Sequence, residues 1–360
     1  MIRVSKNSIL TIKPYIPGKP IEEVKREFGL KDVIKLASNE NPYEPSPKVL
    51  TAIAKHSRTL NRYPDGDCFY LRQALAKRLQ VSPEQLIFGN GSDEIIVFAA
   101  RVSLKKGDEV VIAKPSFLIY EIASKLEEAK IKMIPLKDFR YDLAAMKRAV
   151  TRKTKIIFLG NPDNPAGTYL SDTQIKDFLK GLRQDILIFI DEAYFEYVDA
   201  KDYGNSIELL KTYDNIIVTR TFSKLYGLAG LRVGYGIGNA KLIDVLNRVR
   251  EPFNVNSLAQ VAALACLNDE AYYHKIRLEA KAQKEYLYRE LRDFGLSFAQ
   301  SSTNFIMIHV NNAPAAAKRL MRKGIIVRDM SPWGIKNYIR VTIGLPQENR
   351  RFISALKDIL

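Results

Sequence analysis

The stretch TFSKLYGLAGLRVGY, residues 221–235, places one lysine, Lys224, among apolar residues and one arginine, Arg232, eight positions later. An ammonium group buried without a partner loses most of its hydration, so a lysine in such a place needs an explanation. A desolvated lysine has a lowered pKa, and its free amine forms a Schiff base with an aldehyde. The stretch therefore predicts a site for an aldehyde cofactor, and the rest of the chain must supply the cofactor's other contacts.

Short apolar runs alternate with amphipathic segments upstream of this stretch. Continuous apolar runs are typical of strands that are covered on both faces, and their alternation with helices predicts an α/β fold with a mostly parallel sheet. The predicted helices include 92–104 and 171–182, and the second opens with a capping-box pattern, Ser171 and Gln174. The predicted strands are 85–90, 109–115, 155–162, 186–194, 215–222 and 232–238.

The character of the chain changes after residue 240. Long helical patterns (240–250, 257–293) precede two further strands (304–310, 338–344), the helix 315–324 and a final helix. We expect three parts: an N-terminal arm (1–40) that packs with the small domain, a large cofactor-binding domain with helices on both faces of its sheet (41–255), and a smaller α+β domain (256–360).

Composition and charge exclude several classes of protein. The 56 Lys and Arg exceed the 40 Asp and Glu, but they are interleaved with acids along helical segments, which favours ordinary solvated faces over a nucleic-acid surface. The two cysteines, Cys68 and Cys266, lie far apart without a nearby His cluster, so we expect no metal site and no disulfide, as in a reducing cytosol. No apolar run reaches 18 residues, which predicts a cytoplasmic protein without a membrane span.

Polar residues follow the predicted strands, where ligands bind in open parallel sheets. Gly91 and Ser92 open a helix after the first run, a place suited to a phosphate but also typical of plain turns. Asn164 lies in the rigid turn NPDNPAG (161–167), which is equally compatible with a tight loop. Asp191 ends a run that should be buried, and Tyr194 follows it, although a structural Asp remains an alternative.

The last such strand end returns to Lys224. Thr221 and Ser223 offer hydroxyls to phosphate oxygens, and Arg232 offers a bidentate fork to the same group. Each signal is modest alone. Together they supply an amine for an aldehyde, a carboxylate for a ring nitrogen, a phenol and an amide for a ring hydroxyl, and a phosphate cradle, which is the set that pyridoxal phosphate requires.

TFSKLYGLAGLRVGY closely resembles the signature of the fold type I pyridoxal-phosphate enzymes, specifically the class II aminotransferases: S/T-x-S/T-K, a Gly/Ala-rich step, then L-R-x-G-F/Y. Within that class the chain is similar to the histidinol-phosphate aminotransferases nearly end to end. The supporting stretches are KPYIPGKPIEEV (13–24), IKLASNENPYEPSP (34–47), RYPDGDCFYLRQALA (62–76), FGNGSDE (88–94), NPDNPAGTY (161–169), DEAYFEY (191–197) and YIRVTIGLPQEN (338–349).

The resemblance implies a role for each matching catalytic residue. Lys224 would bind the cofactor aldehyde and later shuttle the proton. Asp191 would pair with the pyridinium nitrogen, and Tyr194 and Asn164 would hydrogen-bond the ring oxygen. Phe117 lies where the family stacks an aromatic ring on the cofactor.

The resemblance also implies the phosphate and substrate contacts. Two arginines, Arg340 and Arg328, would bind the anionic end of the substrate, with Asn41 and Tyr15 nearby. Tyr63 would reach the phosphate bound by the neighbouring subunit, so the implied assembly is a homodimer with a shared active site. The phosphate cradle would consist of Gly91, Ser92, Asp93, Ser223 and Arg232, assisted by Thr221.

The chain departs from the family pattern in places. Asp163 and Ala166 replace the usual Asn and Thr of the turn at 161–167, which puts the local loop geometry in doubt, and Leu225 follows the lysine where Ala or Thr is frequent. Neither change removes a residue that the chemistry needs.

The implied reaction is ping-pong transamination between L-histidinol phosphate and 2-oxoglutarate. The closest alternatives keep the fold, namely aromatic amino-acid aminotransferases and threonine-phosphate decarboxylases. A dinucleotide-dependent dehydrogenase is disfavoured, because Asp108 and Glu109 begin the second run, whereas the ribose-binding acid should end it. A basic regulatory or nucleic-acid-binding protein would need an added binding module, for which the chain has no room.

Overall fold

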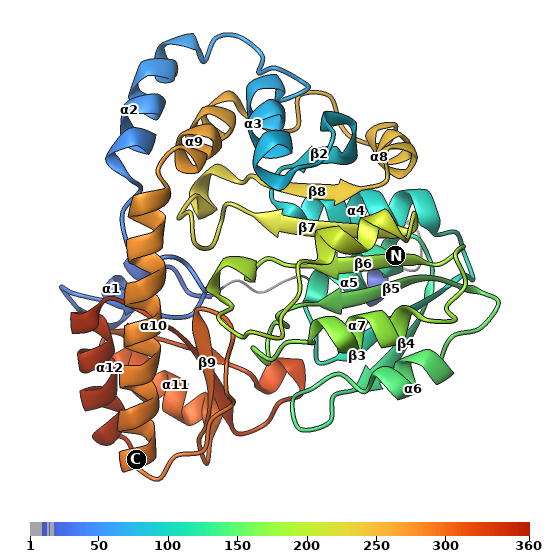
Figure 1. The fold of residues 1–360 in the computed structure, drawn as a ribbon. Coiled ribbons are helices and arrows are strands. Elements are labelled where there is room, and N and C mark those ends of the chain that lie inside the picture. The colour runs from blue at the N-terminus through green and yellow to red at the C-terminus, as the bar shows by residue number, and fades with distance from the viewer. Residues whose placement is uncertain (1–8, 13, 15–17) are drawn as a thin grey trace.

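The computed structural model describes residues 9–12, 14 and 18–360. Its large domain is built on a seven-stranded sheet in the order β2-β8-β7-β6-β5-β3-β4 (Figure 1). β3 to β7 run parallel, and β8 is antiparallel to its neighbours β7 and β2, so the predicted mostly parallel sheet is confirmed. The strands are β2 (Leu86–Gly89), β3 (Glu109–Lys114), β4 (Lys130–Pro135), β5 (Thr154–Gly160), β6 (Leu187–Asp191), β7 (Ile216–Thr221) and β8 (Gly234–Gly238).

Sequence reasoning missed one strand of this seven-stranded sheet, β4, and three two-residue strands outside it, β1 (Ile34–Lys35), β10 (Ile325–Ile326) and β11 (Arg328–Asp329). The sequence of β4, KIKMIP, carries two lysines, and its residues are half-buried or exposed because the strand lies at the edge of the sheet. Edge strands lack the continuous apolar run that marks a strand covered on both faces, so the signal used for the other strands is absent.

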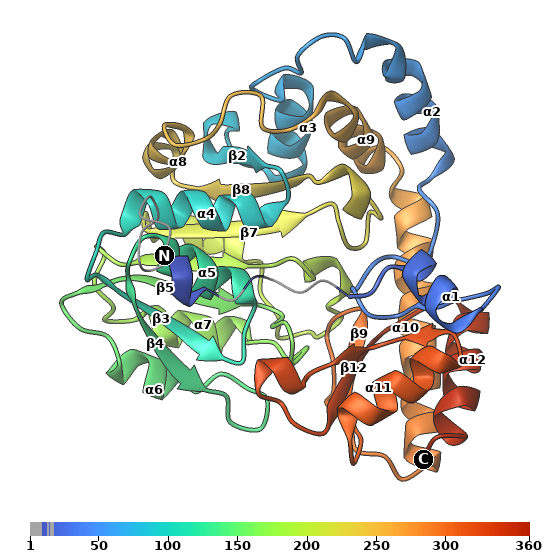
Figure 2. The ribbon, with the colours of Figure 1, turned by 180° about the vertical axis from the view of Figure 1, so that it is seen from behind.

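The two faces of the sheet carry separate cores because successive side chains of a strand point to opposite faces. Phe158 and Phe189 pack with α4, α5 and α8 on the face seen in Figure 2. Ile157 and Ile188 belong to the core on the opposite face, which includes residues of α3, α7 and α9. The helices of the large domain are α2 (Pro47–His56), α3 (Phe69–Leu79), α4 (Ser92–Ser103), α5 (Leu118–Leu126), α6 (Leu143–Arg148), α7 (Asp172–Leu179), α8 (Ala240–Asn247) and α9 (Ser257–Leu267).

The predicted capping box at the start of α7 is confirmed. The Ser171 hydroxyl oxygen accepts a hydrogen bond from the Gln174 N–H at 3.3 Å, and the Gln174 side chain accepts one from the Ser171 N–H at 2.9 Å. Two N–H groups that the helix leaves without partners are thereby satisfied.

The small domain contains a three-stranded antiparallel sheet in the order β11-β12-β9, with α10, α11 and α12 around it (Figure 1). The N-terminal segment joins this domain, because β1 pairs in parallel with β10 and Val24 of α1 packs with Ile326. The elements are α1 (Ile21–Phe28), β1 (Ile34–Lys35), α10 (Glu270–Asp293), β9 (Phe305–His309), α11 (Ala313–Arg322), β10 (Ile325–Ile326), β11 (Arg328–Asp329), β12 (Tyr338–Thr342) and α12 (Pro346–Lys357).

The two domains are joined through α10 rather than at a sharp boundary. Ala259 and Cys266 of α9, and Ile276 in the first part of α10, belong to the core of the large domain. Leu287 and Leu291 in the second part of α10 belong to the core of the small domain. Packing therefore places α9 with the large sheet, whereas the boundary predicted from the sequence, at residue 256, assigns it to the small domain.

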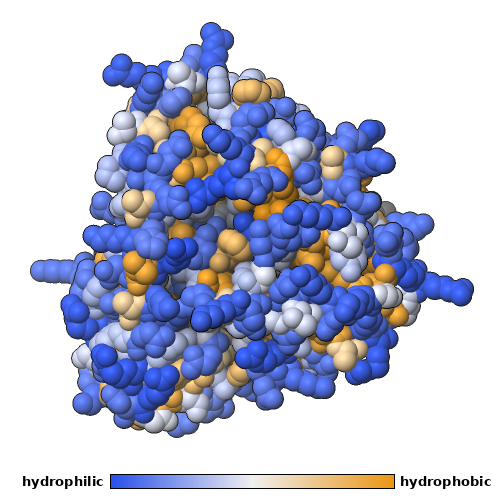
Figure 3. All heavy atoms as spheres, viewed as in Figure 1, coloured by the Kyte–Doolittle hydropathy of each residue, from blue (hydrophilic) through white to orange (hydrophobic). Residues whose placement is uncertain are grey.

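The surface agrees with the scattered charge pattern of the sequence. Hydrophilic residues cover most of the face shown in Figure 3, and the apolar patches between them are small and separate. Cys68 and Cys266 are buried free thiols. Among the described residues, none of the helices combines the length and apolar character needed to cross a bilayer.

Candidate active site

The carboxyl ends of β5, β6 and β7 meet beside the first turn of α4, and a cavity of about 400 Å³ lies between them. This cofactor cavity is the position at which parallel α/β sheets bind ligands. It brings together residues that are far apart in the sequence. The predicted site residues that line it are Ser92, Asp93, Phe117, Asn164, Asp191, Tyr194, Thr221, Ser223, Lys224 and Arg232.

Lys224 has the altered amine that its sequence context predicts. Its Nζ lies 5.6 Å from the centroid of the Tyr194 ring. Burial, together with the positive charges of Arg340 and Arg232, lowers the pKa of Lys224 from 10.5 to about 8, against a smaller opposing effect of Glu40. At pH 7 about a tenth of the Lys224 side chains are therefore free amines, far more than for an ordinary lysine, and the free amine is the form that binds an aldehyde.

Asp191 is buried at the end of β6 and is held by three donors. Its carboxylate accepts hydrogen bonds from the Tyr120 hydroxyl at 2.8 Å, the Ala193 N–H at 3.2 Å and the Thr219 hydroxyl at 3.4 Å. Burial raises the pKa of Asp191 to about 6, and these hydrogen bonds, led by the one from Tyr120, oppose the rise. The carboxylate is thus ionised at neutral pH and suited to a protonated ring nitrogen.

Tyr120 was missed by the sequence reasoning. It is fully buried, and its ring stacks on Phe158 with centroids 4.7 Å apart. The signal that could have found it is its spacing: it follows Phe117 by three residues at the start of α5, so both residues share one helix face and meet edge to face.

The start of α4 forms a narrow cradle. Gly91 has φ +88°, and a Cβ there would lie 2.2 Å from both Arg232 Nη2 and Asp93 Oδ1, so only glycine fits. Arg232 pairs with Asp93 at 2.7 Å and donates to the Ser223 hydroxyl at 3.3 Å. Free N–H groups of the first helical turn, a hydroxyl and a guanidinium therefore converge, which is the donor set for a phosphate.

Tyr194 and Asn164 are positioned by residues of other segments. Asn39 Nδ2 donates a hydrogen bond to the Tyr194 hydroxyl at 2.9 Å, and burial raises the pKa of Tyr194 to about 12, so the phenol keeps its proton. Arg340, from β12 of the small domain, donates to Asn164 Oδ1 at 2.5 Å and to the Ala37 carbonyl at 3.2 Å. Arg340 thus reaches the cofactor cavity of the large domain from the small one.

Arg328 lies in an adjacent space. It pairs in register with Arg340 across β11 and β12, but it lines a second cavity of about 770 Å³ between the N-terminal segment, α5 and the small domain. Its guanidinium lies 4.4 Å from the centroid of the Trp333 ring. Phe117 lines both cavities, so the two spaces adjoin at this ring.

Two predicted residues, Asn41 and Tyr63, do not line the cofactor cavity. Asn41 donates to the Leu225 carbonyl at 2.6 Å and thereby anchors the segment after Lys224. Tyr63 is 82% exposed and stacks on Phe253, with ring centroids 4.8 Å apart. Tyr15 falls outside the described residues.

The unusual turn at 161–167 is supported from within. The buried Asp163 carboxylate accepts hydrogen bonds from the Tyr141 hydroxyl at 3.0 Å and the Ala166 N–H at 3.0 Å. Burial raises the pKa of Asp163 to about 7. The Asp side chain therefore closes the turn locally, and Asn164 still lines the cofactor cavity beside it.

These residues fit pyridoxal phosphate. The cavity offers a partly deprotonated amine, an ionised carboxylate, a protonated phenol and a glycine-lined cradle in which an added Cβ would clash. Phe117 and Tyr120 line its wall and provide an aromatic surface for a planar ring.

Comparison with known proteins agrees with this geometry. Residues 31–356 match the family model described as aminotransferase class I and II. The chain is 47% identical over 357 residues to a histidinol-phosphate aminotransferase of Moorella thermoacetica, covering 99% of this chain and 92% of that one. The chain belongs to the histidinol-phosphate aminotransferase family.

Other relatives support the assignment of this aminotransferase. The corresponding protein of Caldicellulosiruptor saccharolyticus is 45% identical over 98% of this chain and 99% of its own length. A solved structure of the Sinorhizobium meliloti histidinol-phosphate aminotransferase in complex with pyridoxal-5'-phosphate is 27% identical, has a TM-score of 0.91, and is matched over 100% of this chain and 99% of that one. The fold type I architecture expected from the sequence is therefore confirmed.

The hydroxyl of Tyr120 should control the ionisation of Asp191. Tyr120→Phe removes a donor to the charged form, so the pKa of Asp191 should rise by about one unit or more, given the usual strength of hydrogen bonds to charged groups. Tight binding of pyridoxal phosphate would then be lost at a correspondingly higher pH. The dissociation constant of the cofactor, followed by absorbance from pH 5 to 9, measures the shift.

Tyr141→Phe is the matched control, because Tyr141 is also buried and donates to a buried carboxylate, that of Asp163. It should destabilise the fold to a similar extent while leaving the pH dependence of cofactor binding in place. Equal shifts in both variants, or no shift in Tyr120→Phe, would contradict the assigned role.

Proposed function

We propose that this chain transfers the amino group of L-histidinol phosphate to 2-oxoglutarate, giving imidazole acetol phosphate and glutamate, with pyridoxal 5'-phosphate as cofactor. The reaction belongs to histidine biosynthesis. The observation that carries the proposal is the arrangement of the cofactor cavity, in which Lys224 and Asp191 face one space that has the Gly91 cradle as one boundary and Asn164, held by Arg340, as another.

The cofactor contacts are assigned by chemistry. Asp191 would hold the ring nitrogen, Tyr194 and Asn164 the ring oxygen, and Phe117 would cover the ring face. The phosphate would be bound at the start of α4, where Gly91 leaves room beside the backbone of Ser92 and Asp93, and by the side chains of Thr221, Ser223 and Arg232. When the phosphate enters, Arg232 would give up its ion pair with Asp93 and bind the phosphate instead, because the carboxylate and the phosphate are both negatively charged.

Pyridoxal phosphate, when bound, would supply an aldehyde for the substrate amine and a ring that withdraws electrons from the substrate α-carbon, and Lys224 would hold the aldehyde before the substrate enters. Asp191 keeps the proton on the ring nitrogen. Lys224 Nζ would remove the proton from the substrate α-carbon and later deliver it to the cofactor carbon that carried the aldehyde. An amine with a pKa of about 8 can both accept and donate a proton at neutral pH.

Substrate recognition would rest on the two arginines that pair across β11 and β12. Arg340 bonds to Asn164 at the edge of the cofactor cavity, Arg328 lines the adjoining cavity, and a guanidinium fork binds either a phosphate or a carboxylate. One site can therefore take a phosphate monoester in one half-reaction and a dicarboxylate in the other. Tyr15 and Asn41 are proposed as further substrate contacts from the resemblance alone.

A homodimer is part of the proposal. A group of large apolar side chains is exposed near Tyr63, which suits burial by a second copy. Tyr63 itself does not line the chain's own cofactor cavity and would reach the phosphate cradle of the partner. The exposed group consists of Leu60 (56%), Tyr63 (82%), Phe69 (51%), Tyr70 (75%) and Phe253 (45%). We also place the enzyme in the cytoplasm, where free thiols such as Cys68 and Cys266 persist.

The reaction can be tested in a single half-reaction. Cofactor-loaded protein mixed with L-histidinol phosphate, without a keto acid, should lose its visible absorption as the amino group moves to the cofactor, and 2-oxoglutarate should restore it. Conversion by phenylalanine but not by histidinol phosphate would instead make the protein an aromatic aminotransferase. Release of carbon dioxide from threonine phosphate would make it a decarboxylase.

Arg340→Lys sharpens the same test. A point charge replaces a fork, so the concentration of histidinol phosphate for half-maximal conversion should rise about tenfold or more, while cofactor affinity stays within a few-fold. An equal loss of both would show that Arg340 does not act on the substrate.

The shared active site predicts an effect of Tyr63 on cofactor binding. Sedimentation should show a dimer, and Tyr63→Phe should weaken pyridoxal phosphate binding about tenfold by removing a donor to the phosphate. Tyr70→Phe, an equally exposed neighbour, should have little effect. A fully active monomer, or unchanged cofactor affinity in Tyr63→Phe, would remove the basis for the shared site.

A further inference from the structure

A third cavity, of about 720 Å³, lies on the other face of β7 from the cofactor cavity. No residue lines both. Arg220 of β7 and Tyr235 of β8 line this rear cavity, whereas Thr221, the next residue of β7, lines the cofactor cavity. Because neighbouring residues of a strand point to opposite faces, the two spaces are back to back.

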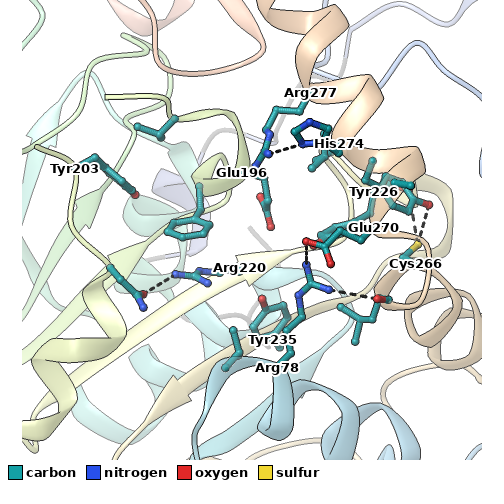
Figure 4. Close-up of a pocket in the computed structure, with 18 of the residues that line it drawn as sticks. Arg78, Glu196, Tyr203, Arg220, Tyr226, Tyr235, Cys266, Glu270, His274 and Arg277 are labelled. Atoms are coloured by element: carbon teal, nitrogen blue, oxygen red, sulfur yellow. Dashed lines mark hydrogen bonds and ion pairs between the residues drawn. The ribbon is translucent and has the colours of Figure 1, made fainter. Parts of the chain in front are cut away.

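One carboxylate oxygen in the rear cavity has no hydrogen-bond partner within the described part of the chain. Glu196 Oε2 is buried, and none of the described residues donates to it. Figure 4 shows this carboxylate pointing into the cavity, with Arg277 and Arg78 on opposite sides of the space. Burial raises the pKa of Glu196 to about 7, against the opposing charge of Arg220. A buried carboxylate oxygen without a hydrogen-bond donor requires one from whatever fills the cavity, either water or a ligand.

The nearby arginine of β7 cannot fill that role. Arg220 is buried and is already committed to Glu192 at 2.8 Å and to Asn205 at 3.1 Å, and its guanidinium lies over the Phe195 ring at 3.4 Å. Glu196 therefore faces a space in which the Arg220 guanidinium is already paired with another acid, Glu192.

The rim of the cavity is basic and partly exposed. Arg277 lies on α10 and bonds to the His274 ring at 2.9 Å, and Arg78 lies at the end of α3, 3.9 Å from Glu270. Arg78 is about as exposed as an ordinary surface arginine, at 39%. A simple anion is disfavoured in this cavity because Glu196 would repel it. A simple cation is disfavoured because the arginines at the rim would repel it.

We propose that the rear cavity is a second small-molecule site, which binds a zwitterion through a protonated amine at Glu196 and a carboxylate at Arg277. Phe195, Tyr203 and Tyr226 supply aromatic walls for the methylene groups between the two charges. The volume exceeds that of a small amino acid, so such a molecule fits.

The walls of this site continue into the catalytic residues. Glu196 follows Tyr194 by two residues in the turn Phe195–Tyr197, and Tyr226 follows Lys224 by two. An occupant of the rear cavity therefore touches the segments that position the phenol and the amine of the active site. Its binding should change the visible absorption of the cofactor-loaded protein as well as produce heat.

The test uses 4-(dimethylamino)butyrate and isothermal titration calorimetry of the cofactor-loaded protein. This probe has one N–H for Glu196 and a carboxylate for Arg277, and as a tertiary amine it cannot react with the cofactor aldehyde. Saturable binding with one site per chain is expected. The analogue 4-(trimethylammonio)butyrate has the same charges without the N–H and should bind at least about tenfold more weakly.

Two variants of the rear cavity and one control variant of the active site locate the binding of the probe. Glu196→Gln should weaken the probe about tenfold or more, Arg277→Gln should weaken it by a smaller factor, and the active-site variant Arg340→Gln should leave it unchanged. Arg277 is an exposed helix residue, so its variant tests the site even if Glu196→Gln fails to fold. Absence of saturable heat would mean that water alone fills the cavity, and weakening by Arg340→Gln equal to that by Glu196→Gln would place the probe in the active site. Either result overturns the proposal.

Discussion

The amine of Lys224 depends on the removal of water at the carboxyl ends of three parallel strands. In bulk water its charge would be solvated, and the side chain would remain an ammonium group at neutral pH. At the end of β7 it lies beside the Tyr194 ring, and the guanidinium groups of Arg340 and Arg232 disfavour a further positive charge. Desolvation and like charge act in the same direction, so the lysine is prepared for covalent chemistry before any ligand arrives.

The same burial would disable Asp191 if nothing opposed it. A carboxylate in an apolar interior tends to take up a proton, and a neutral acid could not keep a ring nitrogen charged. Three donors, of which the Tyr120 hydroxyl is the closest, hold the charged form. Burial shifts both Lys224 and Asp191 toward their neutral forms, and the hydrogen bonds in the cavity restore only Asp191 to its charged form. That asymmetry separates the nucleophilic amine from the electrostatic carboxylate.

The sequence predicts which residues form this site better than it predicts the hydrogen bonds that position them. Lys224, Asp191 and Asn164 follow apolar runs, and strand ends in parallel sheets meet at one edge, so their convergence could be foreseen. Tyr120, Asn39 and Tyr141 act through hydrogen bonds between segments distant in the sequence, and no local pattern marks such partners. Strand β4 was missed for a related reason, since an edge strand carries lysines in place of a continuous apolar run. The join between the domains was also hidden, because one helix, α10, contributes to both cores.

The lowered pKa of Lys224 can be measured directly in the cofactor-free protein. Competitive labelling with trinitrobenzenesulfonate over a range of pH, followed by mass spectrometry of the peptide that contains Lys224, reports the fraction of free amine, with the exposed Lys55 as an internal reference. Because only the deprotonated amine reacts, labelling of Lys224 rises as pH rises through its pKa. The structure predicts a midpoint at about 8, and a midpoint at the ordinary lysine value of 10.5 would contradict the account.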